Sequence, residues 1–389
     1  VTAWLGIEPG RRRLLGLFAA AVGVRVVVAL VLEYGASMGF FASDDYRYEV
    51  VGWELARHWS GESPTPPRIF GASGYYHWNA LLFSAVGRVP LAPTLGNAVA
   101  GGCIALLGWR IALDLTDASG ARYAGWLSAL WPSLVLWSSL NLKDAFAILA
   151  ILLMLRGAQR CMVRPGLRDL LLLGVGVLLL AQLRGYLVGL CLGSMALAYV
   201  LVRLRAAPVW MGAAVLASAL LLALAGPVEH VRLEESLETL DATRSQLAVG
   251  SAAYATEADV STPLGMLRFL PMGLAYFLFA PVPWQLSGLR QLLTLPEMLA
   301  WYALFPFVLS GLRHALRERF AQAMPVATLA ASLSVSYALV EGNLGTAYRH
   351  RAQVLVLLLV FAGAGLARRA GLVRSPAARW PEATREALA

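Results

Sequence analysis

The stretch LLGLFAAAVGVRVVVALVL, residues 14–32, decides the fold class of this chain, and Arg25 is its only charged residue. A membrane-spanning helix needs about 20 mostly apolar residues, so this stretch predicts a helix that crosses a bilayer. Three arginines, residues 11–13, precede it. The stretch is too long for a signal-peptide core and no small-residue cleavage pattern follows it. We therefore expect it to be retained as the first span.

The composition extends this prediction to the whole chain. Of the 389 residues, 59% are hydrophobic and 14% are charged, whereas soluble domains are about 45 to 50% apolar and about 25% charged. These values predict a polytopic, all-α bundle of membrane helices. The net charge of +9 arises from arginines in short clusters between apolar runs, a pattern typical of membrane orientation rather than of nucleic-acid binding. Cys103, Cys161 and Cys191 have neither zinc-site nor disulfide spacing, so we expect neither feature.

Hydropathy predicts ten spans, and two shorter apolar stretches leave the topology open. The spans are expected at residues 14–32, 91–113, 122–139, 144–160, 168–183, 185–203, 209–226, 297–313, 323–340 and 351–369. The stretches at 78–89 and 269–284 are short or interrupted by prolines. If either stretch spanned alone, every later arginine cluster would be exported, against the rule that short cytoplasmic loops are basic. We therefore place both on the outer side.

This threading gives a single transmembrane domain, residues 1–389, in the plasma (inner) membrane with both termini cytoplasmic. It contains two long outer loops, at 33–77 and 227–296. Apolar residues recur at helical spacing over 46–59 and 228–249, which predicts a surface helix in each loop. No internal repeat is visible in the sequence.

The stretch FASDDYRYE, residues 41–49, carries two adjacent carboxylates, Asp44 and Asp45, at the mouth of the first span. Ionised groups at such a place are costly unless they face water, a substrate or each other. A shared site on the outer face explains why so many polar residues fall there, although helix ends are often polar in any case. The other outer-face residues of this kind are Lys143, Asp144, Arg184, Tyr348, Arg349, His350 and Arg351.

The order of these motifs resembles the GT-C superfamily of integral membrane glycosyltransferases, particularly bacterial relatives of protein O-mannosyltransferases and the lipid A aminoarabinose transferase. The segment SDDYRYEVVGWELA, residues 43–56, is similar to the acidic element of that family, with Asp44 matching its Asp and Asp45 its Glu. WPSLVLWSSLNLKDA, residues 131–145, is similar to a second family segment. The resemblance covers about the first 205 residues. YYHW, residues 75–78, stands where the family has Pro-Pro, so no phosphate-binding residue is carried over there.

The resemblance implies a polyprenyl-phosphate-linked sugar as donor and a hydroxyl acceptor, which is a glycan, a lipid or a protein, at an extracytoplasmic active site. Inverting transfer requires a base on the acceptor hydroxyl and cations for the departing phosphate. We assign the base to Asp44. Asp45 raises the basicity of its neighbour, or instead holds Arg47 or a metal.

For the phosphate we consider first residues 348–351, the run Tyr348, Arg349, His350 and Arg351, and then Arg184 with Lys143 and Asp144, because the planar guanidinium matches phosphate oxygens. Two alternatives stay open: the arginines snorkel to lipid headgroups, or Lys143 and Asp144 form a salt bridge that holds a loop. No cofactor is predicted with certainty. A divalent metal bound by Asp44, Asp45 and Glu49 is a further alternative.

Two other functions fit the same residues. A polymerase or ligase of lipid-diphosphate-linked glycans also joins sugars at the outer face. A flippase or transporter of a lipid-linked saccharide would instead show charges at mid-membrane depth and paired repeats with broken helices. Only Arg25 lies clearly inside a span, so the sequence favours the enzyme.

Overall fold

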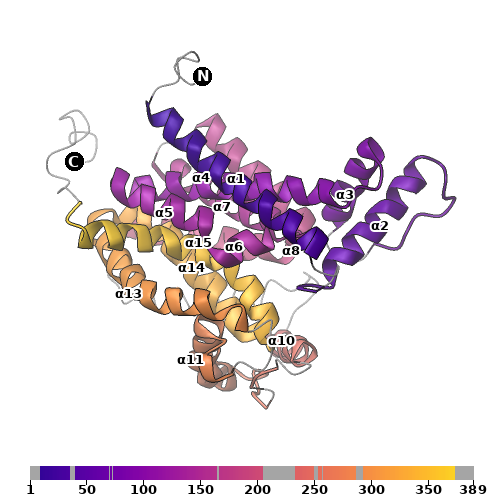
Figure 1. Ribbon diagram of the computed structural model, residues 1–389. Helices are drawn as coiled ribbons and strands as arrows, with labels where there is room; N and C mark the ends of the chain where they lie inside the picture. Colours follow the sequence, from indigo (N-terminus) through magenta and orange to yellow (C-terminus); the bar gives the residue numbers. More distant parts are fainter. Residues whose placement is uncertain are drawn as a thin grey trace.

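The computed structural model describes residues 9–35, 40–69, 71, 73–163, 166–204, 233–248, 253–255, 257–285 and 292–372. Every regular element in these ranges is a helix, which confirms the all-α prediction (Figure 1). In chain order they are α1 (Pro9–Gly35), α2 (Asp44–Trp59), α3 (Ser73–Val86), α4 (Leu91–Leu115), α5 (Ala118–Leu130), α6 (Pro132–Trp137), α7 (Asp144–Val163), α8 (Leu167–Leu204), α10 (Leu233–Leu247), α11 (Pro263–Phe279), the 3-10 helix η1 (Pro283–Gln285), α13 (Leu295–Glu318), α14 (Phe320–Val340) and α15 (Leu344–Arg369).

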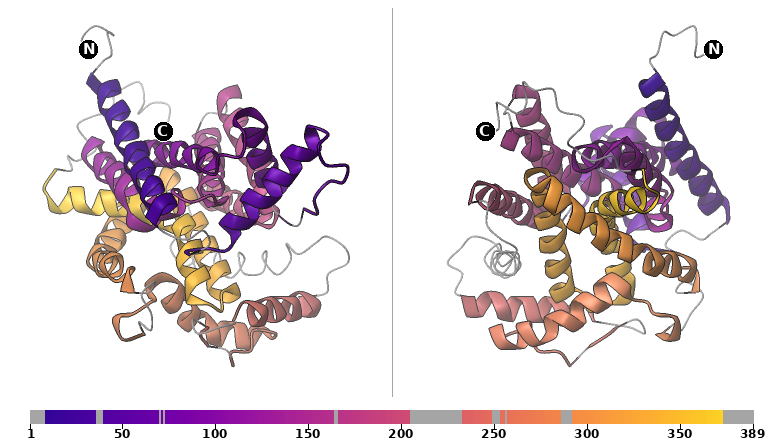
Figure 2. Two further views of the ribbon diagram at one scale, coloured as in Figure 1. Left: turned by 45° about the vertical axis from the view of Figure 1, so that its right-hand side comes forward. Right: turned by 90° about the vertical axis from the view of Figure 1, so that its left-hand side faces the viewer.

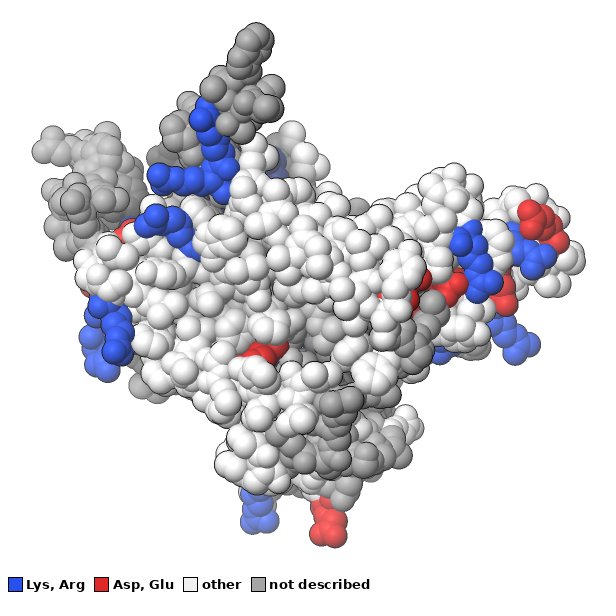
Figure 3. Space-filling model, in the orientation of Figure 1, with Lys and Arg blue, Asp and Glu red and all other residues white. Residues whose placement is uncertain are grey.

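Within the described ranges, seven helices are long and apolar enough to cross a membrane: α1, α4, α7, α8, α13, α14 and α15. The helices α14 and α15 are buried over most of their length, whereas only 22% of the apolar part of α1 is buried. Much of the surface in Figure 3 carries no charged side chain, as a lipid-facing surface requires. The chain is therefore a multi-pass membrane protein. Its total of about ten spans stays a prediction, and the expected span at 209–226 lies outside the described residues.

The predicted span at 122–139 is divided into two short helices. Helix α5 ends at Leu130 and α6 begins at Pro132. A proline disfavours helical geometry in the residue that precedes it, and Trp131 is accordingly extended, with ψ of 124°. Neither helix reaches the length of a span by itself.

Arg25 of α1 is fully buried against this break. It donates to the Ala129 carbonyl at 2.7 Å and to Ser138 Oγ at 2.7 Å, which lie on the two sides of the interruption. A Cβ atom at Gly101 would lie 2.1 Å from the Arg25 Nε, so a glycine is needed on the facing surface of α4. The charged side chain inside the first span thus has a structural role, because its hydrogen bonds join α1 to the segments on both sides of the α5–α6 break.

Helix α8 contains a reversal of the chain at Arg184, whose φ and ψ of −149° and 69° are not helical. Before the break, Asp169 lies 3.7 Å from Arg160 near the C-terminal end of α7. Arg184 itself contacts Asp144 at the N-terminal end of α7. After the break, Leu201 packs on Met324 near the start of α14, the same end at which Gln159 of α7 bonds to Gln322. Residues 167–183 and 185–204 are therefore antiparallel arms that meet at the predicted boundary.

The predicted surface helices correspond to α2 and α10. Helix α2 packs mainly on α3, and the two project together from the bundle on the right of Figure 1. Helix α3 covers most of the doubtful stretch 78–89, and α11 with η1 covers 269–284; both helices are shorter than the seven candidate spans. Two further views show α10 and α11 lying together along one side of the bundle (Figure 2).

Candidate functional site

Three helix N-termini and the break in α8 meet at one end of the bundle. Asp44 and Asp144 begin α2 and α7, Arg349 lies in the second turn of α15, and Arg184 occupies the break. Helix ends leave backbone groups without intrahelical partners, so polar residues concentrate there. The fold brings four of the predicted site residues into one chain of ion pairs, although the two partners of one pair are 305 positions apart.

Asp144 is the centre of this cluster and is almost completely buried. Arg184 Nη2 donates to its Oδ1 at 2.7 Å, and Arg349 donates to its Oδ2 from Nε at 2.9 Å and from Nη2 at 2.6 Å. A buried carboxylate requires such pairing, because an unpaired buried charge is strongly destabilising. Asp144 therefore holds two guanidinium groups at a set separation.

Arg349 links this buried pair to Asp44. Its Nη1 donates to Asp44 Oδ2 at 2.9 Å, and the Asp44 side chain is 47% exposed, compared with 12% for Arg349. Asp44 is thus the member of the chain of ion pairs that an incoming molecule reaches most easily.

On its other side, Arg184 contacts His350. Arg184 Nη1 lies 2.9 Å from His350 Nε2, and because arginine only donates, Nε2 accepts and the ring carries its hydrogen on Nδ1. That hydrogen is donated to Glu341, which also accepts a bond from Thr346. Burial alone raises the pKa of Glu341, but His350, Thr346 and Arg184 outweigh burial and lower that pKa below its ordinary value.

Lys143 lies beside Asp144 and is half-buried. Burial and then the neighbouring Arg184 lower the pKa of its amine to about 8. Among the residues described, its ammonium forms no ion pair or hydrogen bond, and Arg184 Nε is likewise buried without an acceptor. The cluster consequently retains donors that its own carboxylates do not satisfy.

A network of buried amides shapes the turn that carries Lys143. Asn97 donates to the Leu140 and Leu142 carbonyls at 2.6 and 2.9 Å and to Tyr75 Oη at 2.8 Å. Tyr75 in turn donates to Asn141 Oδ1 at 2.9 Å. These positioning residues were not predicted. Amides within otherwise apolar helices were the signal that would have indicated them.

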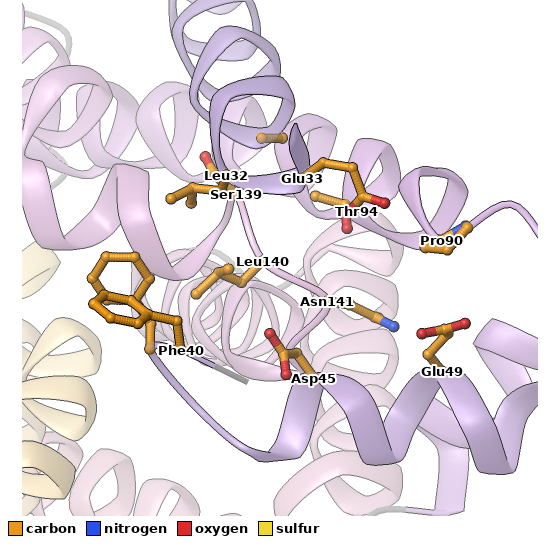
Figure 4. A pocket seen from close by; sticks show the side chains of 12 residues that line it. Leu32, Glu33, Phe40, Asp45, Glu49, Pro90, Thr94, Ser139, Leu140 and Asn141 are labelled. Atoms are coloured by element: carbon orange, nitrogen blue, oxygen red, sulfur yellow. The ribbon is translucent and has the colours of Figure 1, made fainter. Parts of the chain in front are cut away.

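Asp45 points away from its neighbour, because consecutive helical residues differ by about 100° around the axis. It lines a pocket that Glu33 of α1 and Glu49 of α2 also line (Figure 4). Glu49 accepts a bond from Arg88 Nε at 2.9 Å. The remaining lining residues are Ala29, Leu32, Phe40, Phe41, Pro90, Thr94, Ser139, Leu140 and Asn141.

Two of the residues considered for phosphate binding, Tyr348 and Arg351, lie in a separate cluster. Arg351 is 1% exposed and donates from Nε to the Phe277 carbonyl at 2.6 Å, with a second bond to the Ala280 carbonyl. Tyr348 donates to Glu297 at 2.6 Å. Positions 348 and 351 share a helix face, whereas Arg349 points elsewhere. The structure therefore does not bring Arg351 or Tyr348 to Asp44.

The described part of the chain contains no group of three or more histidine, cysteine or acidic residues arranged to hold a metal. Asp44 faces Arg349 while Asp45 and Glu49 face the pocket, so the three carboxylates considered for a metal do not converge. No protein-family model, curated protein or solved structure matches this chain.

Proposed function

We propose that this protein is a membrane glycosyltransferase that moves a sugar from a polyprenyl-phosphate donor to a hydroxyl acceptor. The GT-C resemblance of residues 43–56 and 131–145 suggested this reaction. The first segment forms most of α2, which begins with Asp44, and the second contains α6 and ends on the first two residues of α7, which begins with Asp144. The observation that carries the proposal is the contact between an accessible carboxylate, Asp44, and the cationic cluster around Asp144, at the end of apolar helices.

Arg349, Arg184 and Lys143 are the cations that would stabilise a lipid phosphate. Arginine offers parallel donors that match two phosphate oxygens, and an unpaired ammonium adds a compact charge. Arg349 already shares its donors between Asp44 and Asp144. A phosphate that replaced Asp44 on Nη1 would free that carboxylate at the moment when the base is needed.

These side chains account for the proton and for the leaving group of the transfer. The acceptor oxygen attacks C1 of the sugar while Asp44 takes the hydroxyl proton. The bond from C1 to the phosphate oxygen breaks, the electron pair leaves with the phosphate, and the cations stabilise its charge. Attack on the face opposite the leaving phosphate inverts the configuration at C1.

The position of Arg25 favours an enzyme over a transporter. A charge inside a span suggests a transport pathway when it faces a water-filled cavity. Arg25 is instead fully buried, and its donors go to Ser138 Oγ and to the Ala21, Ser128 and Ala129 carbonyls.

The test is sugar transfer by the purified full chain in lipid nanodiscs, with polyprenyl-monophosphate and polyprenyl-diphosphate sugars offered in parallel and membrane extract as acceptor. We expect transfer from the monophosphate donor, a loss of at least about 100-fold for Asp44→Asn, and wild-type activity for Glu54→Gln, a matched amide substitution at an exposed position of α2. Use of the diphosphate donor alone would indicate the polymerase or ligase. Full activity of a folded Asp44→Asn protein would refute the assigned base.

A further inference from the structure

The pocket beside Asp45 differs in charge from the cluster around Asp144. The carboxylates of Glu33, Asp45 and Glu49 face it, and none of the described residues that line it is basic. Arg88 pairs with Glu49 from outside the lining. Coulomb repulsion in such a partly buried space disfavours an anionic ligand and favours a cation.

Thr94 provides a second and independent indication of a ligand. It lies on α4 in the wall of the pocket and is only 6% exposed. Its hydroxyl forms no hydrogen bond with any residue that the structure describes. The hydroxyl is open to the pocket, where it can donate a hydrogen bond to a polar group of a ligand or accept one from it.

The arrangement suits an organic cation better than a metal ion. A calcium ion, for example, requires six or more oxygens within about 2.3 to 2.6 Å, whereas Glu33 and Asp45 face the pocket from opposite sides (Figure 4). The described residues form no cluster suited to a metal. Leu32, Phe40 and Leu140 add an apolar wall, which fits the ring or carbon skeleton of a larger molecule.

We propose that this pocket binds an ammonium-bearing polyhydroxylated ligand, an amino sugar unit, as the acceptor of the transfer. Only the role of the ligand as acceptor rests on the proposed function; the binding of the amino sugar does not depend on it. Asp44 and Asp45 are consecutive, so the first turn of α2 separates the cationic cluster from the acidic pocket. A sugar held by Asp45 and Thr94 would therefore lie on the opposite side of Asp44 from the phosphate, where its hydroxyl could reach the base.

Binding to the full chain in nanodiscs tests this without any phosphate donor. Methyl glucosaminide and methyl glucoside serve as probes. They differ at one position, where the first carries an ammonium group and the second a hydroxyl. We expect the glucosaminide to bind about tenfold more tightly, as a hydrogen bond to a charged group implies. This preference should disappear in Asp45→Asn and at a pH where the amine is neutral. Thr94→Val should weaken both sugars, and Glu54→Gln is the control.

Equal affinity for the two sugars, or an unchanged preference in Asp45→Asn, would overturn the proposal. Binding of Mg²⁺ alone that Asp45→Asn abolishes would also overturn it, because the pocket would then be a metal site. Failure of the proposed function is distinguishable. A protein that binds the glucosaminide through Asp45 but transfers no sugar retains the pocket and loses the transferase reaction.

Discussion

Lys143 is the only lysine in the chain, so an amine-directed reagent reports on the cationic cluster directly. Burial and Arg184 lower its pKa to about 8. At pH 8 about half of the amine is then neutral, compared with about 0.4% of an ordinary lysine of pKa about 10.4. The reactive fraction is therefore on the order of 100-fold larger than in the unfolded chain.

The assay is acylation of the full chain in nanodiscs over a range of pH, followed by mass spectrometry of the peptide that contains Lys143. The measured quantity is the midpoint of the rate profile, which does not depend on the nucleophilicity of the amine. We expect a midpoint near the pKa of about 8 in the folded protein, and an ordinary midpoint near pH 10 after unfolding in denaturant. A folded midpoint near pH 10 would refute the placement of Lys143 beside Arg184.

Addition of a polyprenyl monophosphate extends the same measurement to the proposed function. An anion beside the amine favours its charged form, so the pKa of Lys143 should rise by about one unit or more. Acylation at pH 8 would then fall by severalfold, up to about tenfold. An unprenylated sugar should leave the rate unchanged. If the phosphate lipid also left it unchanged, Lys143 would not be part of a phosphate site.

Three further predictions concern stability, measured by chemical unfolding in detergent micelles. Asp144→Asn removes the carboxylate that the buried Arg184 and Arg349 share and leaves Arg349 only its pair with Asp44, so it should cost about 3 to 5 kcal/mol, whereas Asp114→Asn at a partly exposed pair should cost less. Gly311→Ala places a Cβ atom 1.9 Å from the Phe361 carbonyl oxygen, so it should cost about 1 to 3 kcal/mol or more, while Gly23→Ala meets nothing within 4 Å and should be tolerated. Tyr348→Phe removes the bond to Glu297 and should cost about 1 to 3 kcal/mol with sugar transfer retained; a loss of transfer in a stable protein would return Tyr348 to the site.

Apolar length was a reliable guide to the helices, because burying a backbone in lipid requires an internally bonded helix wherever the side chains are apolar. The predicted boundary at Arg184 coincides with the reversal in α8, and the predicted surface helix at 46–59 coincides with most of α2. The interruption at Trp131 was missed, although Pro132 stood in the sequence. A proline inside an apolar stretch can either kink one helix or end it and begin another. A hydropathy average over the stretch is the same in both cases, so it does not distinguish them.

The amino-acid sequence by itself determined that the chain is a bundle of membrane helices, and that its unusual polar residues stand at helix ends. Those properties are local, since they depend on composition and on spacing within one segment. The partners of those residues were decided only by the tertiary structure. Asp44 and Asp45 are adjacent in the sequence, and Arg349 and Arg351 are two positions apart, yet only Asp44 and Arg349 belong to the cluster around Asp144. Helix rotation and packing select the member that faces the cluster around Asp144, and a sequence pattern does not record the rotation of each helix.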